Sequence, residues 1–206
     1  MPSFCLKLVL LFAALTLTGC GKESERTSTE LGLGNLRWGS FPVEVQVDAF
    51  LLSDAQATAD LQDAIAFWEV KAGKPLFTIA GSWDSAQKPY TGPIEDPTEL
   101  LANVIFFQGP WPFDNRIAGK TVVHSSNGTI SRAVILLNAE TSLCGHDCRN
   151  NAGEVSRRKL LAHELGHYLG LGHNQDTNDV MYPEILQGGS LEGLKVDEPL
   201  LTTLTQ

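Results

Sequence analysis

The residues best suited to chemistry in this chain form the segment His163-Glu164-Leu165-Gly166-His167. Two histidines four positions apart lie about one turn apart on the same face of a helix. Both imidazoles can then bind one metal ion, and Glu164 lies beside the open position where a catalytic water would be held. We therefore predict that His163 and His167 are metal ligands and that Glu164 is the catalytic base.

Gly170 and His173 extend this segment to the pattern HExxHxxGxxH. A glycine can end the helix in the left-handed conformation and reverse the chain, so that His173 reaches the same metal from outside the helix. Three imidazole ligands leave the fourth tetrahedral position to water, which is typical of a catalytic zinc site. The alternative is an amphipathic helix with surface histidines, for which the full pattern would be a rare coincidence.

A second motif, Val180-Met181-Tyr182-Pro183, follows the third histidine at a distance that fits a methionine turn. Together the two motifs resemble the metzincin clan of zinc endopeptidases, and Val-Met-Tyr-Pro is most similar to the matrixin branch. The resemblance covers residues 41–206 in element order, with its specific motifs in 163–183. It implies one catalytic Zn²⁺ ion held by the three histidines, with Met181 in a turn beneath the metal.

The resemblance also implies metal-assisted hydrolysis of peptide bonds in protein or peptide substrates. Zinc lowers the pKa of its bound water to about 7, and Glu164 passes the water proton to the leaving amine. In metzincins an edge strand before the active-site helix binds the substrate as an added strand, and Ala133–Asn138 is the segment in that position. A buried strand is an equally good interpretation of that segment. Residues 184–196 are expected to line the pocket after the scissile bond.

Some residues depart from the family pattern. Matrixins usually have Ser after the third histidine, where this chain has Asn174, which leaves the metzincin branch open. Pro183 occupies the place of the zinc-interacting Tyr of astacins and serralysins, so Tyr182 is not predicted to be a ligand. Only His124 and His146 remain for a structural zinc, and we predict no such site. A Ca²⁺ ion is compatible with the acidic composition, but no clear series of ligands supports it.

Two rival functions share this motif. The first is a lipid-anchored zinc-binding protein that uses a metzincin fold for binding rather than proteolysis. Glu164 argues against it, because a pure binding module does not need a base beside the open ligand position. The second is an amidase or another hydrolase built on the same site. The sequence does not name the substrate.

Cys144 and Cys148 flank Gly145-His146-Asp147. In an exported protein the favoured interpretation is a local disulfide between the two cysteines. The alternatives are a second metal site formed by Cys144, His146 and Cys148, and a pair of free thiols.

Elements that position the motifs are indicated by periodicity and turn residues. Phe41–Val47 alternates apolar and polar residues and predicts a first strand. Ser53, with Gln56 as its capping-box partner, is predicted to begin a helix that ends at Gly73. Residues 81–100 are expected to form a surface excursion. Further strands are predicted at 75–80, 103–108, 120–124 and 133–138, with a turn at 126–128.

The helix that carries the histidines is predicted to cover residues 152–169, with Asn151 and Glu154 at its capped start. The basic run Arg157–Lys159 is expected on a solvated face of this helix. A short terminal helix is expected from Asp197. The order of elements predicts an α+β (α/β-like) domain with a mixed twisted sheet, two main helices and a small, loop-rich C-terminal subdomain.

The N-terminus has the pattern of a secretory signal. Lys7 precedes an apolar run, Leu8–Leu17, that is shorter than the roughly 20 residues of a transmembrane helix. The residues Leu17-Thr18-Gly19-Cys20 resemble the lipobox of bacterial lipoproteins, in which the cysteine is lipidated. An ordinary signal peptide that ends near a cysteine is the alternative.

These patterns predict three regions: a lipoprotein signal peptide at 1–19, a flexible tether at 20–40 and a catalytic domain at 41–206. A lipid on Cys20 would anchor the domain in the bacterial cell envelope, facing outside the cytoplasm. The residues after Cys20 resemble those of lipoproteins sent to the outer membrane of Gram-negative bacteria.

The composition and net charge limit which classes of partner the protein is expected to bind. The chain has 206 residues and a formal net charge of −9, so it would repel nucleic-acid phosphates, and we expect no nucleic-acid partner. Its 43% hydrophobic and 19% charged residues are ordinary for a folded domain, and a monomer is expected. The expected partners are a protein or peptide substrate and, through the lipid, a membrane.

Overall fold

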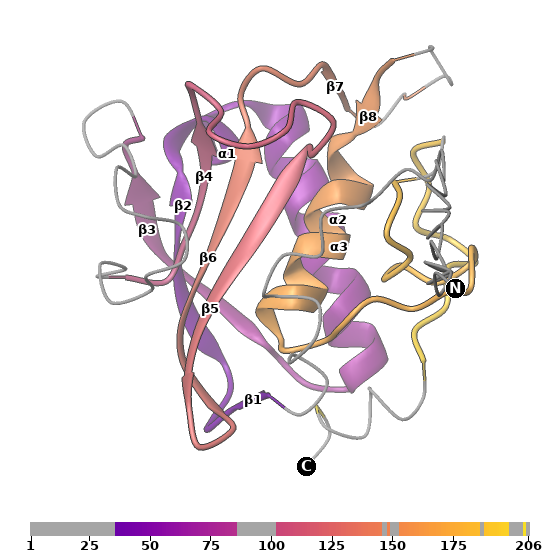
Figure 1. Ribbon diagram of the computed structural model, residues 1–206. Helices are drawn as coiled ribbons and strands as arrows, with labels where there is room; N and C mark the ends of the chain where they lie inside the picture. Colours follow the sequence, from indigo (N-terminus) through magenta and orange to yellow (C-terminus); the bar gives the residue numbers. More distant parts are fainter. Residues whose placement is uncertain are drawn as a thin grey trace, which may run out of the picture.

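The computed structural model describes residues 36–85, 102–145, 148, 153–185, 188–197 and 204 (Figure 1). The predicted signal peptide, Cys20, His146 and most of the expected terminal helix lie outside these residues. Within the described residues, no helix is both long and apolar enough to span a membrane. The elements in chain order are β1 (Arg37–Trp38), β2 (Val43–Asp48), α1 (Ala49–Ser53), α2 (Ala55–Ala72), β3 (Phe77–Trp83), β4 (Val104–Gln108), β5 (Gly119–Ser126), β6 (Thr129–Asn138), β7 (Leu143–Cys144), β8 (Val155–Ser156) and α3 (Arg157–Tyr168).

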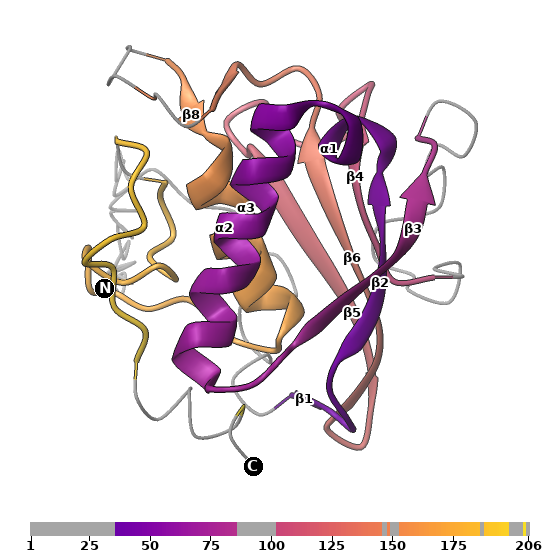
Figure 2. The same ribbon diagram turned by 180° about the vertical axis from the view of Figure 1, so that it is seen from behind.

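One mixed sheet and two main helices form the domain. The strand order is β1-β6-β4-β2-β3, with β5 added beside β6. The pairings are parallel except that of β5 with β6, which is antiparallel. Helices α2 and α3 lie next to each other on one face of this sheet (Figures 1 and 2). The predicted α+β class with a mixed sheet and two main helices is therefore confirmed.

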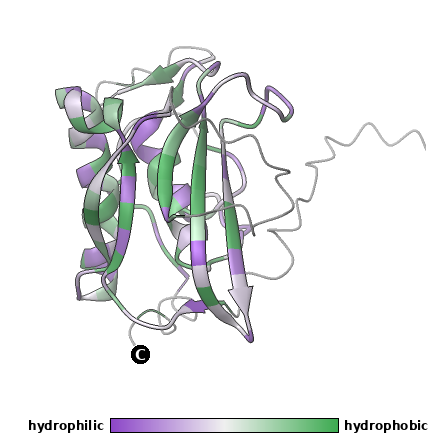
Figure 3. Ribbon diagram, turned by 90° about the vertical axis from the view of Figure 1, so that its left-hand side faces the viewer, coloured by the Kyte–Doolittle hydropathy of each residue, from purple (hydrophilic) through white to green (hydrophobic). Residues whose placement is uncertain are grey.

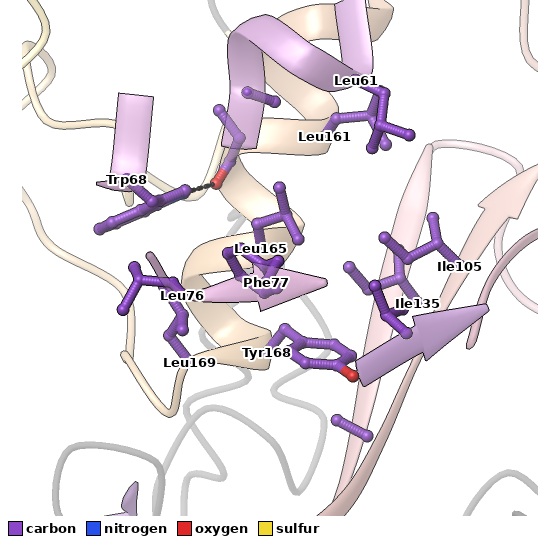
Figure 4. Close-up of a cluster of buried hydrophobic side chains, with 14 of the residues drawn as sticks. Leu61, Trp68, Leu76, Phe77, Ile105, Ile135, Leu161, Leu165, Tyr168 and Leu169 are labelled. Atoms are coloured by element: carbon purple, nitrogen blue, oxygen red, sulfur yellow. Dashed lines mark hydrogen bonds between the residues drawn. The ribbon is translucent and has the colours of Figure 1, made fainter. Parts of the chain in front are cut away.

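Strand β6 is buried on both faces because apolar side chains alternate between two clusters. Ala133, Ile135 and Leu137 pack into the core beneath the helices, together with Trp68, Leu165 and Tyr168 (Figure 4). Its alternate residues Val134 and Leu136 belong to a second cluster on the opposite face. Figure 3 shows the hydrophobic colouring running along the strands, while the helix beside the sheet alternates between hydrophobic and hydrophilic residues.

The edge strand beside the helix that carries the histidines is β5. Strand β6 is paired with β5 on one side and with β1 and β4 on the other, so of the two interpretations of Ala133–Asn138 the buried strand is confirmed and the edge strand is wrong. A continuous apolar run is typical of a strand buried on both faces, whereas β5 carries the mixed pattern of an edge. The turn at Asn127 and Gly128, both with positive φ, joins these two strands.

Helix α2 begins one residue later than predicted. Its N-cap is Asp54, whose side chain accepts a hydrogen bond from the amide of Ala57, and not Ser53 with Gln56. Ser53 instead ends the short helix α1. The predicted end at Gly73 is confirmed, because this residue adopts a left-handed conformation with φ of 68°. The predicted excursion also begins too early, since residues 81–83 belong to β3.

Helix α3 begins at Arg157, not near residue 152. Its N-cap is Ser156, whose hydroxyl accepts a hydrogen bond from the amide of Lys159, so the predicted cap at Asn151 and Glu154 is wrong. Arg157 is buried and pairs with the buried Asp60 of α2 at 2.8 Å, which contradicts the expected solvated face at this residue. The N-terminal half of α3 is thus fixed to α2 by a charged contact.

The folded domain begins before residue 41. Trp38 lies within the predicted tether 20–40, yet its indole Nε1 donates to the carbonyl of Tyr168 at 2.8 Å. The two rings also stack, with centroids 5.4 Å apart. The main-chain carbonyl of Leu36, two residues before Trp38, lies against Gly170, just beyond the end of α3. Residues 36–38 therefore pack on the C-terminal end of the helix that carries the histidines.

The C-terminal part is loop-rich, as predicted. Among the described residues from 171 to 197, the only strand-like pairing is an isolated bridge between Asp179 and Lys195. Val180, Met181 and Val196 from this part nevertheless belong to the core beneath α2 and α3. The loop is therefore fixed by buried side chains rather than by regular secondary structure.

Candidate metal centre

The three predicted ligands come together. The Nε2 atoms of His163, His167 and His173 lie 3.0–3.2 Å from one another. His163 and His167 occupy successive turns of α3, and His173 arrives from the loop beyond Gly170. Gly170 has φ of 97°, and the amide of Leu171 donates to the carbonyl of Gly166, which reverses the chain as the sequence predicted.

Hydrogen bonds to main-chain carbonyls orient two of the rings. His163 Nδ1 donates to the carbonyl of Val180 at 2.9 Å, and His167 Nδ1 donates to that of Leu171 at 2.8 Å. A carbonyl only accepts, so in the neutral ring Nδ1 carries the proton and Nε2 presents a lone pair. This is the usual arrangement of imidazoles that bind a metal through Nε2.

The residues present fit a zinc ion. Nitrogen ligands at about 2.0–2.1 Å from a tetrahedral ion lie about 3.3–3.4 Å apart, close to the spacing of the three Nε2 atoms. Converging lone pairs without protons to share repel one another unless a cation lies between them. Among the described residues, this is the only group of three or more histidine, cysteine or carboxylate side chains placed to share an ion.

Burial keeps the first two histidines neutral in the metal-free protein. Desolvation lowers the pKa of His163 from 6.5 to about 4, against a smaller opposite effect of the Val180 carbonyl. Burial also lowers the pKa of His167 well below its ordinary value, and the neighbouring histidines add to the shift. Both rings are therefore in the protonation state that a metal requires at neutral pH.

This burial predicts how the stability of the metal-free protein depends on pH. Between about pH 6.5 and 4 the unfolded chain protonates His163 while the folded chain does not. The buried histidines should therefore lower the free energy of unfolding as pH drops through this window, by up to about 1.4 kcal/mol per pH unit for each of them. Glu164, whose pKa burial raises to about 7, contributes with the opposite sign, so the comparison with a histidine variant isolates the histidine effect. Urea unfolding of metal-free protein from pH 7.5 to 4.5 measures this slope. The variant His163→Asn should give a shallower slope, and equal slopes would contradict the assignment.

Glu164 lies between α3 and the edge strand β5. The residue is 4% exposed, and its Oε2 accepts a hydrogen bond of 2.6 Å from the Thr121 hydroxyl. Burial raises the pKa of Glu164 to about 7, while the Thr121 hydrogen bond and the Lys120 charge act in the opposite direction. A carboxyl group with a pKa near neutral pH can both accept and release a proton.

The methionine turn is tied to the third ligand through Asn174. The Asn174 amide donates to the carbonyl of Met181 at 2.9 Å, and its side-chain Nδ2 donates to Asp179 Oδ2 at 3.0 Å. Asp179 Oδ1 in turn accepts from the Met181 amide at 2.8 Å. Asn174, noted in the sequence as a departure from matrixins, thus links the residue after His173 to the turn that contains Met181.

Met181 packs directly beneath the histidine helix. The residue is fully buried, and a Cβ atom added at Gly166 would overlap its Sδ atom and approach the Trp68 ring. Gly166 lies between Glu164 and His167 on α3, so this close approach determines how near the turn comes to the metal centre. The glycine of the HExxH segment is therefore needed for packing.

Gly166→Ala should destabilise the protein, although Gly to Ala within a helix is normally stabilising by about 1 kcal/mol. The overlap with Met181 Sδ reverses the sign, and a loss of about 1–3 kcal/mol is expected. Thermal and urea unfolding of the metal-free protein measure the change. Gly172→Ala is the matched control, because nothing lies within 4 Å of a Cβ at that position. A Gly166→Ala variant as stable as this control would contradict the packing argument.

Cys144 and Cys148 form a disulfide in the structure. Strand β7, which contains Cys144, pairs with β8, and Cys144 lies opposite Ser156, the N-cap of α3. A Cβ at Gly145 would overlap the Gln56 side chain of α2, so the start of the loop packs on that helix. The disulfide therefore lies next to the N-terminal end of the helix that carries His163 and His167.

Sequence reasoning missed Thr121, Asp179 and Trp38 as neighbours of the site. Thr121 was part of a predicted strand, but only the antiparallel pairing with β6 shows which strand adjoins α3. The alternation in that strand places Thr121 and Val123 on one face and Val122 on the other, which is the signal that would have identified Thr121. His124, by contrast, lies away from the three-histidine cluster and contacts Ser131 at 2.8 Å.

A mixed sheet with an antiparallel edge strand, a helix that carries two histidines beside it and three converging imidazoles fit a zinc site. Comparison with known protein families matches residues 45–198 to the family described as Matrixin. This match covers most of the chain, so the protein belongs to the matrixin family, whose members are zinc metallopeptidases. A search of the curated proteins found no match.

Proposed function

We propose that this protein is a zinc-dependent endopeptidase that hydrolyses peptide bonds with Glu164 as general base. The observation that carries the proposal is the convergence of three Nε2 atoms within 3.2 Å beside a buried glutamate on the same helix. His163, His167 and His173 would hold the metal, which when bound supplies a Lewis acid for the scissile carbonyl. Membership of the matrixin family supports this assignment.

The protein's own residues account for the proton transfers. Glu164 would accept a proton from the attacking water and pass it to the nitrogen of the leaving amine as the C–N bond breaks. In the metal-free protein burial raises the pKa of Glu164 to about 7, so the carboxyl group can take up and release a proton near neutral pH. Thr121 and the Lys120 ammonium favour the ionised form that acts as a base.

The substrate is proposed to bind along β5. Among the described residues this strand pairs with β6 alone, so its outer edge presents main-chain groups to an extended peptide. The strand begins at Gly119, where an added Cβ would lie 2.9 Å from Glu164 Oε1. A peptide paired with β5 would therefore run past the catalytic carboxylate, and main-chain pairing gives broad sequence tolerance.

A cleavage-site profile tests the endopeptidase function. Purified protein loaded with zinc is incubated with a denatured protein mixture, and mass spectrometry locates the new N-termini. Internal cleavages that disappear with a zinc chelator are expected. Cleavage confined to chain ends, or hydrolysis of amides that are not peptide bonds, would point to another hydrolase. Zinc binding with no cleavage of any substrate would support the rival function of binding.

The anchored location is a separate proposal. The segment Leu17–Cys20 resembles a lipobox, and we propose that lipid on Cys20 holds the domain in a bacterial cell envelope. The expected result is that the full chain fractionates with membranes, that mass spectrometry finds a lipid on Cys20, and that Cys20→Ala carries no lipid. Cys5→Ala is the control and should be lipidated like wild type, since Cys5 lies within the signal. A wild-type chain without lipid on Cys20 would refute the anchor.

A further inference from the structure

The Glu164 carboxylate faces the inner side of the edge strand β5. Thr121 Oγ1 lies 2.6 Å from Glu164 Oε2, and both residues are almost completely buried. On the same face of the strand, Gly119 leaves space for the carboxylate, because an added Cβ would lie 2.9 Å from Oε1. Thr121 thus supplies a hydrogen-bond partner for the Glu164 carboxylate, and Gly119 leaves the space that the carboxylate occupies.

The same hydroxyl also reaches a second oxygen of Glu164. Thr121 Oγ1 lies 3.1 Å from the main-chain carbonyl of Glu164, so it is between the side-chain and main-chain oxygens of one residue. A hydroxyl has one proton to donate and two lone pairs with which to accept. With the carboxylate ionised, the short contact is a charge-assisted hydrogen bond from Thr121 to Oε2.

The geometry also suits a protonated Glu164. The carboxyl O–H would then donate to Thr121 Oγ1, and the Thr121 proton would turn to the main-chain carbonyl of Glu164 at 3.1 Å. Both arrangements use the same heavy-atom positions and differ in the proton on the carboxyl group and in the rotation of the Thr121 hydroxyl. A general base is ionised and then protonated in each catalytic cycle. A hydroxyl that can hydrogen-bond to either form therefore keeps the carboxyl group in one place.

We propose that Thr121 is a positioning residue that holds the Glu164 carboxyl group through the catalytic cycle by reversing its hydroxyl hydrogen bond. This inference rests on the proposed function of Glu164. Thr121 neither gains nor loses a proton: the proton taken from the attacking water goes to Glu164 and then to the leaving amine. The residue acts through Glu164, to which both of its side-chain hydrogen bonds are made.

Two substitutions separate the hydroxyl from the side-chain shape. Thr121→Val keeps the β-branched shape without the hydroxyl, and Thr121→Ser keeps the hydroxyl without the methyl group. We expect Thr121→Val to lower kcat about ten- to a hundredfold with KM and zinc content unchanged, because a hydrogen bond to a charged group is lost. Thr121→Ser should retain most of kcat. Thr78→Val, the same substitution at an exposed position of β3, is the control and should not change kcat.

A second measurement does not depend on catalysis. In crystals of the zinc-free protein, the Glu164 carboxyl group should keep its position in Thr121→Ser and move or become disordered in Thr121→Val. If Thr121→Val does not fold, Thr121→Ala is measured in its place. An unchanged kcat in the variant without the hydroxyl would overturn the proposal. So would a Thr121→Ser variant as impaired as Thr121→Val, or an unmoved Glu164 in the zinc-free crystals.

Failure of the proposed endopeptidase function and failure of the proposed role of Thr121 would give different results. If the protein does not cleave peptides, wild type itself is inactive, and the zinc-free crystals still show whether Thr121 positions Glu164. If wild type cleaves peptides and Thr121→Val cleaves them equally well, the endopeptidase function stands and the role of Thr121 is refuted.

Discussion

Glu164→Gln is expected to abolish peptide cleavage while zinc stays bound. Glutamine has nearly the shape of glutamate, and its side-chain oxygen can still accept the hydrogen bond from Thr121. The amide cannot take a proton from water, so the contribution of a general base, about 10²–10⁴-fold in rate, is lost. Cleavage of a denatured protein, followed by mass spectrometry, measures the loss, and elemental analysis measures zinc.

A matched control distinguishes the loss of the base from a general effect of neutralising a carboxylate. Glu44 is exposed on β2, so Glu44→Gln removes the same charge at a residue with no part in the proposed site. This control should cleave at the wild-type rate. Cleavage by Glu164→Gln at more than about a tenth of the wild-type rate would exclude Glu164 as the general base.

Removal of zinc is expected to abolish cleavage and to lower stability. The three Nε2 atoms lie 3.0–3.2 Å apart, and those of His163 and His167 present lone pairs to the centre of the cluster, an arrangement that a cation stabilises. A ligand that binds only the folded state adds about 4 kcal/mol at a concentration a thousand times its Kd. Dialysis against a chelator should therefore lower the unfolding temperature, and added zinc should restore both stability and activity.

Two histidine variants assign the metal to this cluster. His167→Ala removes a buried ligand that contacts both other rings and should leave less than about a tenth of the bound zinc. His124→Ala removes a histidine of β5 that lies outside the cluster and should leave the zinc content unchanged. Activity that survives complete removal of metal, or zinc lost in the His124 variant alone, would contradict the assignment.

The helix that carries the chemistry could be predicted because its signals are local. His163 and His167 are one turn apart in any helix, and Gly170 permits the reversal that brings His173 back. The end of α2 at Gly73 is equally local. Helix starts were predicted less well, because Ser53, Asp54, Asn151 and Ser156 are all acceptable caps, and packing selects Asp54 and Ser156.

The strands show the limit of local patterns more clearly. Apolar alternation located β2, β4, β5 and β6 to within a few residues, but it did not give their order in the sheet. A buried strand has a paired strand on each side, whereas an edge strand has one on a single side. The neighbouring strands come from segments far away in the chain. The sequence therefore left the apolar run at 133–138 open between an edge strand and a buried strand, and the pairings show that it is buried and that β5 is the edge.

The sequence alone thus predicted the family and the three histidines that the structure brings together, since residue types and their spacing within one helix and the following turn carry both signals. It also supplied the proposal that Glu164 is the base. Only the tertiary structure decided what surrounds these residues. Thr121 contacts Glu164 across 43 positions of sequence, and Trp38 contacts the end of α3 across 130. Such contacts depend on strand pairing and on helix packing, which bury these groups together and which no short-range pattern encodes.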